Sequence, residues 1–233
     1  MVANITETKR KLDIVLCIDG TGSMVPYIDS VKKNAVKFKS DLVRELTDMH
    51  SDIDSMRIKT IVFRDYEEDG DEAMQESMFF ELPQDEADFV KYMDGITANG
   101  GGDAPENGLE ALYYAMKSDF IATGDKDRQV IVLFTDTDAL DLGERKACSG
   151  YPADMVDENG LVETWACVKQ EKGLKLRDKT KRLVMFAPSG TKYEQLKPRL
   201  ERSVFQAVSY DAGLGDIDFG DIIKIIAASV ASA

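Results

Sequence analysis

The chain has 233 residues, and 43% of them are hydrophobic, which is enough to bury one sizeable core. Asp and Glu (43) outnumber Lys and Arg (29), and the net charge of −14 argues against nucleic acid or an anionic membrane as a partner. No apolar stretch resembles a signal peptide or a membrane span, and three widely spaced cysteines suit a reducing compartment, so we expect a cytoplasmic protein.

The first half of the chain alternates apolar strands with amphipathic helices. From Val25 onward, apolar residues recur every three or four positions, which is typical of a helix with one buried face. A turn-rich acidic stretch, YEEDGDE, precedes an expected edge strand. The pattern predicts strands at 12–18, 57–63 and 74–82 and helices at 25–46, 85–95 and 105–118.

The second half repeats this alternation. It predicts strands at 129–134, 182–187 and 203–208 and helices at 154–170 and 193–201, with a last helix from about Ile217 to Val230. Strands that alternate with helices indicate an α/β fold with a mostly parallel central sheet, helices on both faces and the 74–82 strand antiparallel at one edge. We expect an N-terminal tail at 1–11 and a single domain at 12–233.

Oxygen-bearing side chains cluster in three loops that follow predicted strands. Asp19, Thr21 and Ser23 come directly after the first strand, Asp103 enters a helix after three glycines, and Asp136 follows the strand at 129–134. In parallel sheets, ligands bind beyond the carboxyl ends of the central strands. Carboxylates, hydroxyls and water are the ligands that Mg²⁺ and Mn²⁺ prefer, so the sequence predicts a divalent-cation site at this edge.

These three loops resemble the metal-ion-dependent adhesion site of the von Willebrand factor type A (VWA) domain family. The first motif of that family, D-x-S/T-x-S, is matched by Asp19, Thr21 and Ser23, and the aspartate of its third loop is matched by Asp136. The second loop of the family usually provides a threonine, where this chain has Asp103. The segments FRDY and GGGDAPE look like a bacterial or intracellular branch of the family.

The resemblance implies a three-layer, Rossmann-like VWA fold over roughly residues 10–230. It also implies a metal site formed by Asp19, Thr21, Ser23, Asp103 and Asp136, with Mg²⁺ or Mn²⁺ as the expected ion and Ca²⁺ as a third candidate. In that family the metal binds a carboxylate from a partner protein and performs no catalysis. The resemblance therefore implies a non-enzymatic protein-binding module whose partner is unidentified.

Structural roles compete with metal binding for several of these residues. Asp, Thr and Ser all favour helix N-caps, so the side chains of the first loop are also candidates for capping. Asp103 and Glu106 flank Pro105 in a capping-box arrangement, so Asp103 either contacts the metal or caps a helix. Asp65 is expected either to hydrogen-bond a metal ligand or to pair with Arg64 or another base. Asp138 and Asp141 are expected to be solvated loop acids.

Two other classes of function stay open. Asp19-Gly20-Thr21 resembles part of the D-x-D-G-T motif of haloacid-dehalogenase-like phosphatases, but Cys17 stands where their nucleophilic aspartate belongs, which argues against a Mg²⁺-dependent hydrolase. The alternative is a scaffold subunit with a vestigial metal site.

The segment 138–160 is long for a connection without regular structure. We expect it to form one side of the metal site and to help select the partner.

Overall fold

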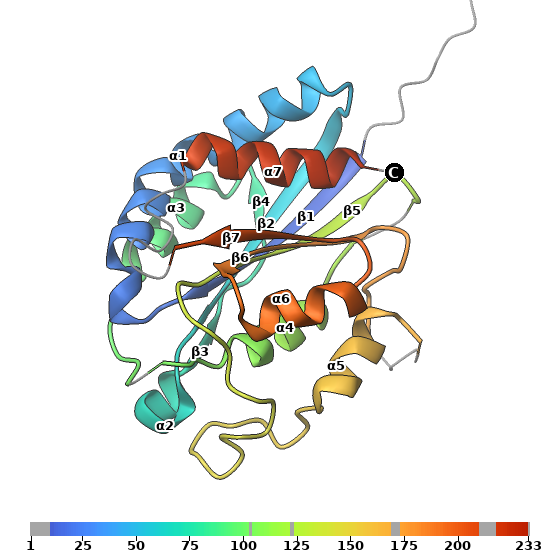
Figure 1. Ribbon diagram of the computed structural model, residues 1–233. Coiled ribbons are helices and arrows are strands. Elements are labelled where there is room, and N and C mark those ends of the chain that lie inside the picture. The colour runs from blue at the N-terminus through green and yellow to red at the C-terminus, as the bar shows by residue number, and fades with distance from the viewer. Residues whose placement is uncertain (1–9, 103, 122–123, 169–172, 210–217, 233) are drawn as a thin grey trace, which may run out of the picture.

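The two most apolar segments of the chain form neighbouring strands in the middle of one sheet (Figure 1). The structure is a computed structural model and describes residues 10–102, 104–121, 124–168, 173–209 and 218–232. β1 (Arg10–Asp19) pairs in parallel with β5 (Arg128–Phe134), with Ile18 opposite Phe134. The other strands are β2 (Ile53–Phe63), β3 (Met74–Glu76), β4 (Phe80–Leu82), β6 (Lys181–Pro188) and β7 (Ser203–Val208).

The sheet has the strand order β3-β2-β1-β5-β6-β7, and β4 also pairs with β2. β2, β1, β5, β6 and β7 are mutually parallel, whereas β3 and β4 run antiparallel to β2. The expected mostly parallel sheet is therefore confirmed. The edge strand predicted at 74–82 is divided into two strands of three residues each, because Ser77 between them bonds to Thr60 through its backbone N–H and its hydroxyl.

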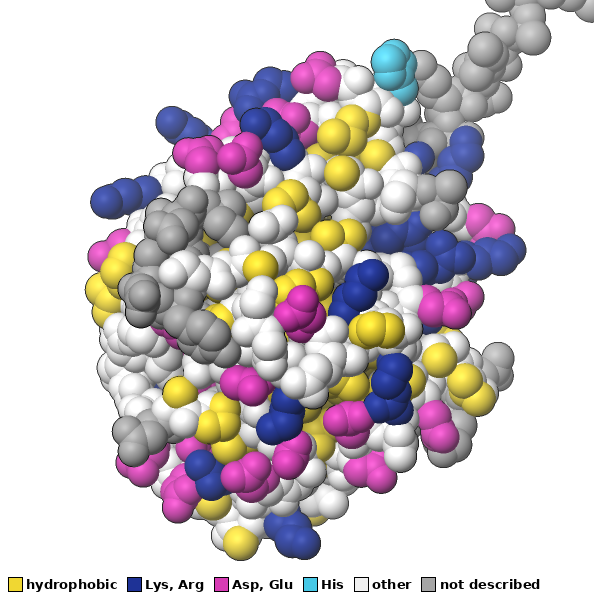
Figure 2. Space-filling model, in the orientation of Figure 1, with side chains coloured by type: hydrophobic (Ala, Val, Ile, Leu, Met, Phe, Trp, Pro, Cys, Tyr) yellow, Lys and Arg dark blue, Asp and Glu magenta, His cyan; other side chains and the backbone are white. Residues whose placement is uncertain are grey.

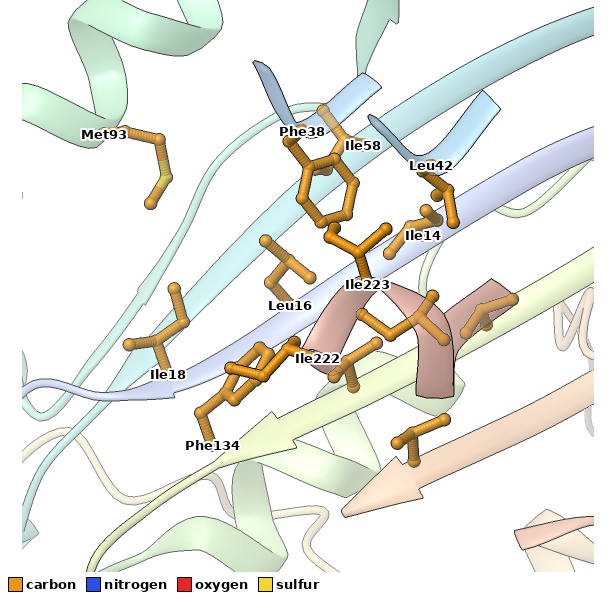
Figure 3. Close-up of a cluster of buried hydrophobic side chains, with 14 of the residues drawn as sticks. Ile14, Leu16, Ile18, Phe38, Leu42, Ile58, Met93, Phe134, Ile222 and Ile223 are labelled. Carbon is orange, nitrogen blue, oxygen red and sulfur yellow. The ribbon is translucent and has the colours of Figure 1, made fainter. Parts of the chain in front are cut away.

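Helices cover both faces of the sheet because successive strand residues point to opposite sides. Ile14, Leu16 and Ile18 of β1 pack with side chains of α1, α3 and α7, as Figure 3 shows. Val15 and Cys17 pack on the opposite face with α4, α5 and α6. The helices of the first face are α1 (Val25–Asp48), α3 (Glu86–Gly95) and α7 (Phe219–Ala231), and those of the second are α4 (Gly108–Met116), α5 (Glu158–Trp165) and α6 (Lys192–Leu196).

The remaining helices are short and lie in loops. They are α2 (Tyr66–Asp69) and three 3-10 turns, η1 (Gly22–Met24), η2 (Gly70–Glu72) and η3 (Lys197–Arg199). α2 lies in the acidic stretch that the sequence predicted as turns, and Asp65 caps it by accepting a hydrogen bond from the Glu67 N–H. Among the described residues, no helix is long and apolar enough to cross a membrane.

Candidate metal centre

The candidate site lies where β1 and β5 end, at the point where the strand order reverses direction along the sheet. In the sheet, β2 lies beside β1 on one side, whereas β5, β6 and β7 lie in that order on the other side of β1. Because β1 and β5 are parallel and in register up to Ile18 and Phe134, Asp19 and Thr135 come out at the same edge. This is the usual position of ligand sites in open α/β sheets.

Asp19 is buried, and neighbouring donors occupy both of its carboxylate oxygens. Thr21 donates to Oδ1 through its backbone N–H (2.9 Å) and through Oγ1 (2.6 Å), and Thr135 Oγ1 donates to Oδ2 (2.7 Å). These three bonds fix the orientation of the carboxylate. They also bring the loop after β1 into contact with the loop after β5.

Ser23 and Asp136 extend this cluster toward solvent. Thr21 Oγ1 lies 3.3 Å from Ser23 Oγ, and Ser23 Oγ donates to Asp136 Oδ1 at 3.0 Å. Ser23 is exposed and Asp136 is half-buried, so the cluster opens to solvent on this side. The structure thus brings together four of the five predicted site residues, and Asp103 lies outside the described residues.

The side chains of this first loop do not cap the helix that follows. Thr21 occupies the N-cap position of η1 and Met24 that of α1, and neither forms a side-chain capping bond. The hydroxyls of Thr21 and Ser23 bond instead to the two carboxylates. The capping alternative therefore does not explain why these residue types stand here.

Two glycines allow the loops to approach each other. A Cβ at Gly20 would lie 2.5 Å from Val62 Cγ1, so a side chain there would push β1 and β2 apart. Gly101 has a φ of +65°, and a Cβ there would lie 2.5 Å from Thr21 Cγ2 and 2.8 Å from Glu106 Oε1. Glycine at 101 lets the second loop close over Thr21.

Glu106 belongs to this site, although the sequence analysis placed it in a capping box. The expected helix start is wrong, because α4 begins at Gly108 with Asn107 as its N-cap. Glu106 instead pairs with Ala139 in a short bridge, and it is buried with one carboxyl oxygen, Oε2, that has no partner among the described residues. The pair Asn107-Gly108 was the sequence signal for a later helix start.

Arg64 is a second residue that the sequence analysis did not assign to the site. It is buried, and its guanidinium donates to the carbonyl oxygens of Gly20, Glu72, Thr97 and Asn99 at 2.8–3.1 Å. These carbonyls belong to the loop after β1, to η2 and to the segment leading into the second loop. Arg64 therefore connects the loops around the site through their backbones rather than by pairing with Asp65.

Asp65 pairs with Arg145 from the long segment after β5. Arg145 Nε and Nη2 lie 2.8 and 2.7 Å from the two carboxylate oxygens of Asp65, and Arg145 Nη1 lies 2.7 Å from Glu67 Oε2. The ion-pair interpretation of Asp65 is thus correct, with Arg145 in place of Arg64. Asp138 is not a simple solvated acid, because its Oδ1 accepts bonds from the N–H groups of Ala139 and Lys192.

Burial, together with neighbouring acids, raises the pKa of two carboxyl groups at this edge, those of Asp19 and Glu106. Burial raises the pKa of Asp19 to about 6, against bonds from Thr21 and Thr135 that lower it, and nearby Asp136 adds to the rise. Burial raises the pKa of Glu106 to about 8, with further contributions from Asp19, Asp65, Asp69 and Asp136. A cation at this place would relieve both effects.

The donor set fits a hard divalent cation. Asp19, Thr21, Ser23 and Asp136 offer only carboxylate and hydroxyl oxygens, and Glu106 adds an unpartnered carboxyl oxygen nearby. Mg²⁺ commonly uses one or two carboxylates and keeps several waters. The described residues contain no cluster of three or more His, Cys, Asp or Glu side chains suited to a metal, so a cation held here would need the hydroxyls of Thr21 and Ser23.

Cys17, which stands where the phosphatase motif has its nucleophile, is not placed to act as one. Cys17 is fully buried in the layer between the sheet and α4, and its thiol donates to the carbonyl of Ala111. Burial raises the pKa of the Cys17 thiol far above its usual range. A buried, protonated thiol cannot accept a phosphoryl group.

Comparisons with known proteins agree with this arrangement of strands and loops. A family model described as "von Willebrand factor A domain" matches residues 13–149. A domain described as von Willebrand factor type A from Catenulispora acidiphila superposes with a TM-score of 0.52 at 11% identity, over 96% of this chain and 43% of that chain. The pilus adhesin SpaC from Lactobacillus rhamnosus GG superposes with a TM-score of 0.57 at 10% identity, over 96% of this chain and 31% of that chain.

A curated relative matches part of the sequence. The alpha-protein kinase vwkA of Dictyostelium discoideum is 31% identical over 96 residues, which are 41% of this chain and 14% of that protein. The chain thus spans less than half of the length of each of these three proteins. The two structures, at 10% and 11% identity, support the fold alone.

Proposed function

The chain belongs to the von Willebrand factor A domain family, and we propose that it binds a partner protein through one divalent cation at the ends of β1 and β5. Domains of this family are commonly protein-interaction modules and are generally not enzymes. The observation that carries the proposal is the continuous cluster of Asp19, Thr21, Ser23 and Asp136, with hydroxyl and carboxylate oxygens within hydrogen-bond distance of each other.

Each residue of the cluster has a distinct part in this proposal. Thr21 and Ser23 bind the cation through their hydroxyls, and Asp19 and Asp136 bind it directly or through water. Thr135 orients Asp19 through its 2.7 Å bond to Oδ2. Bound Mg²⁺ or Mn²⁺, or Ca²⁺ as a third candidate, supplies an electrophilic position for a carboxylate of the partner.

The second loop sets the charge of the proposed site. Asp103 stands where the family usually has a threonine, and Glu106 adds a buried carboxyl close to Thr21. More negative charge around the cation strengthens its retention and weakens its attraction for an incoming carboxylate. We therefore expect Asp103→Thr to weaken Mg²⁺ binding in isothermal titration calorimetry, and an unchanged affinity would remove Asp103 from the proposed site.

Direct titration with Mg²⁺ or Mn²⁺ tests the metal site itself. Ser23→Ala removes one hydroxyl from an exposed side chain, so the fold should be kept while the affinity for the cation falls at least tenfold. Ser40→Ala is the matched control, because Ser40 is an exposed serine of α1 whose hydroxyl bonds only within that helix. Equal affinities of the two variants for Mn²⁺ would contradict the proposed site.

Partner binding is tested by affinity capture from the source cell, with Mg²⁺ in one sample and EDTA in the other. We expect a protein that is retained by the wild type with Mg²⁺ and lost with EDTA or with Ser23→Ala. A partner that stays bound under all three conditions would instead support a scaffold with a vestigial metal site. Turnover of p-nitrophenyl phosphate with Mg²⁺ would contradict the assignment as a non-enzyme.

A further inference from the structure

Arg64, the basic residue of the FRDY segment, anchors the start of the second loop. Its guanidinium is buried and donates to the carbonyl oxygens of Thr97 (2.9 Å) and Asn99 (2.8 Å), which lie just before the three glycines. It also donates to the carbonyl of Gly20, in the loop after β1, at 3.1 Å. One planar group therefore joins the first loop to the second.

The guanidinium packs directly against the backbone of the first loop. A Cβ at Gly20 would lie 3.1 Å from Arg64 Cζ, so the absence of a side chain there makes room for the arginine. The Asn99 N–H donates to the same carbonyl of Gly20 at 3.0 Å, and the Gly20 N–H donates to the carbonyl of Phe63 at 2.8 Å. Side-chain and backbone bonds together thus set the separation of the two loops.

The three glycines that follow pack closely against α2. A Cβ at Gly100 would overlap Asp69 Oδ1, and a Cβ at Gly102 would lie 2.7 Å from Glu68 Cγ. The Gly101 N–H donates to Asp69 Oδ2 at 2.9 Å. In Figure 2, acidic side chains lie at the surface at the lower left, where Figure 1 shows α2. The acidic helix α2 therefore holds the glycine run through its backbone.

The FRDY segment and the glycine run are thus two parts of one clamp. FRDY provides Arg64 and leads into α2, which provides Asp69, and the glycines let the backbone lie close to α2 and to the first loop. The second loop is fixed at Asn99 by Arg64 and at Gly101 by Asp69. Its position beside the first loop is therefore set from two sides.

Loops that are held in this way favour a small cation. Mg²⁺ requires a near-ideal octahedron with ligands at about 2.0–2.1 Å, whereas Ca²⁺ accepts about six to eight oxygens at about 2.3–2.6 Å in flexible arrangements. A site whose loops cannot move apart binds the smaller ion better than the larger one. If the loops are loosened, this advantage should be lost.

We propose that Arg64 is a positioning residue that makes the site at the ends of β1 and β5 selective for small divalent cations over Ca²⁺. Arg64 acts through the backbone of Gly20, Thr97 and Asn99, and not by contact with the cation. This role rests on the proposed metal site. It differs from a purely stabilising role because it predicts a change in ion selectivity as well as in stability.

Isothermal titration calorimetry with Mg²⁺ and with Ca²⁺ tests this proposal on the full chain. Arg64→Lys keeps the charge, but a single ammonium cannot replace the planar fork that reaches carbonyls of several segments. We expect the Mg²⁺ affinity to fall at least about tenfold and the Ca²⁺ affinity to change much less. The ratio of the Ca²⁺ to the Mg²⁺ dissociation constant should therefore fall.

Arg57→Lys is the matched control. Arg57 donates to both carboxylate oxygens of buried Asp13 at 2.9 and 2.6 Å, nearer the amino end of β2, so its replacement costs stability away from the site. We expect this variant to keep the wild-type ratio of dissociation constants. Unfolding in urea, measured for both variants, shows how much stability each one loses.

A second anchor can be removed without changing a buried arginine. Asp69→Ala deletes the acceptor for the Gly101 N–H from a half-buried side chain and should also lower the ratio. Asp69→Asn keeps an acceptor and should lower it less. A metal-free measurement is the hydrogen exchange of the Asn99 N–H in EDTA, which should be faster in Arg64→Lys than in Arg57→Lys.

Three results would overturn the role of Arg64. The first is a wild type that binds Mg²⁺ with a ratio that stays unchanged in both Arg64→Lys and Asp69→Ala. The second is an equal fall of the ratio in Arg57→Lys, because a general loss of stability would then explain both. The third is a wild type that binds Ca²⁺ more tightly than Mg²⁺. A wild type that binds neither ion would instead overturn the proposed metal site, and this role with it.

Discussion

Buried charged side chains lie at both ends of the parallel strands. They are acidic at the carboxyl ends and basic at the amino ends, and their hydrogen-bonding partners differ. At the carboxyl ends, Asp19 and Glu106 are buried close to other acids, and burial and repulsion from neighbouring acids raise their pKa values. At the amino ends of β5 and β6, Arg128 and Arg182 are equally buried, and their guanidinium groups point at the last turn of α7.

The hydrogen-bonding groups of the two arginines are satisfied by the protein itself, whereas one oxygen of Glu106 is not. Arg128 donates to the carbonyls of Val230 and Ser232, and Arg182 donates to those of Ser229 and Ser232. These carbonyls form the negative end of the dipole of α7. One oxygen of Glu106, by contrast, has no partner among the described residues. The difference indicates that the basic end stabilises the fold, whereas burial of the acids costs stability that a bound cation would restore.

Arg182→Met should have the largest effect on stability. Arg182 donates to four backbone carbonyls and to Ser232 Oγ, so the substitution leaves several buried acceptors without a donor. We expect the free energy of unfolding in urea to fall by at least about 3 kcal/mol. Arg44→Met, at an exposed arginine of α1, should change it by less than about 0.5 kcal/mol. A loss below 1 kcal/mol at Arg182 would contradict a stabilising basic end.

Asp19→Asn should have the opposite sign at the acidic end. With a folded pKa of about 6 and an ordinary value of 3.8, ionised Asp19 opposes folding at neutral pH by about 3 kcal/mol. The amide keeps an acceptor for Thr21, and the Thr135 hydroxyl can accept as well as donate. In EDTA at pH 7.5 the variant should therefore be more stable than the wild type, by up to that amount.

The pH dependence of this difference supplies a second measurement. Between the two pKa values the folded state binds more protons than the unfolded state, so the wild type gains stability as the pH falls from 7 toward 4. The variant lacks this gain, and its advantage in urea unfolding should shrink over that range. A variant that is less stable than the wild type at pH 7.5 in EDTA would contradict the view that Asp19 costs stability without a cation.

Gly101→Ala should have a smaller effect, at the place where the second loop contacts the first. A methyl group there requires a left-handed backbone and meets Thr21 Cγ2 at 2.5 Å, so we expect a loss of about 2 kcal/mol and weaker Mn²⁺ binding. Gly22→Ala is the matched control, because nothing lies within 4 Å of its Cβ position. Equal Mn²⁺ affinities in calorimetry would show that closure over Thr21 is not needed.

The strands, and the meeting of four of the five candidate site residues at one edge, were predictable from the sequence because they depend on local patterns. Apolar runs locate β1 and β5, and the polar residues that follow each run must come out at one edge of a parallel sheet. Asp19, Thr21, Ser23 and Asp136 were placed together in this way, and the hydrogen bonds between them confirm that they meet. That they bind a metal stays a prediction.

Arg64 and Glu106 were not predicted because their environments are formed by distant segments. Glu106 is buried by a bridge to Ala139, and Arg64 bonds to carbonyls as far away as Asn99. The local spacing of apolar residues cannot predict such long-range contacts. A glutamate directly after a proline is also typical of an ordinary helix start. The division of the edge strand at Ser77 was missed for the same reason, since it depends on bonds to Thr60.

Arg145→Gln should have the smallest effect, and it tests a basic side chain that pairs with acids near the site. Arg145 forms a bidentate pair with buried Asp65 and contacts Glu67, so it neutralises part of the acidic end from the segment after β5. Because Arg145 is partly exposed, we expect a loss of only about 1 kcal/mol in urea unfolding. Hydrogen exchange should increase in residues 138–157, which lose this link to α2.

The response of this variant to Mg²⁺ separates the effect of Arg145 from that of a cation. If a bound cation, and not Arg145, offsets the repulsion between the acids, added Mg²⁺ should still raise the melting temperature of the variant. Loss of that Mg²⁺ response would instead show that Arg145 is what makes the acidic end competent to bind metal.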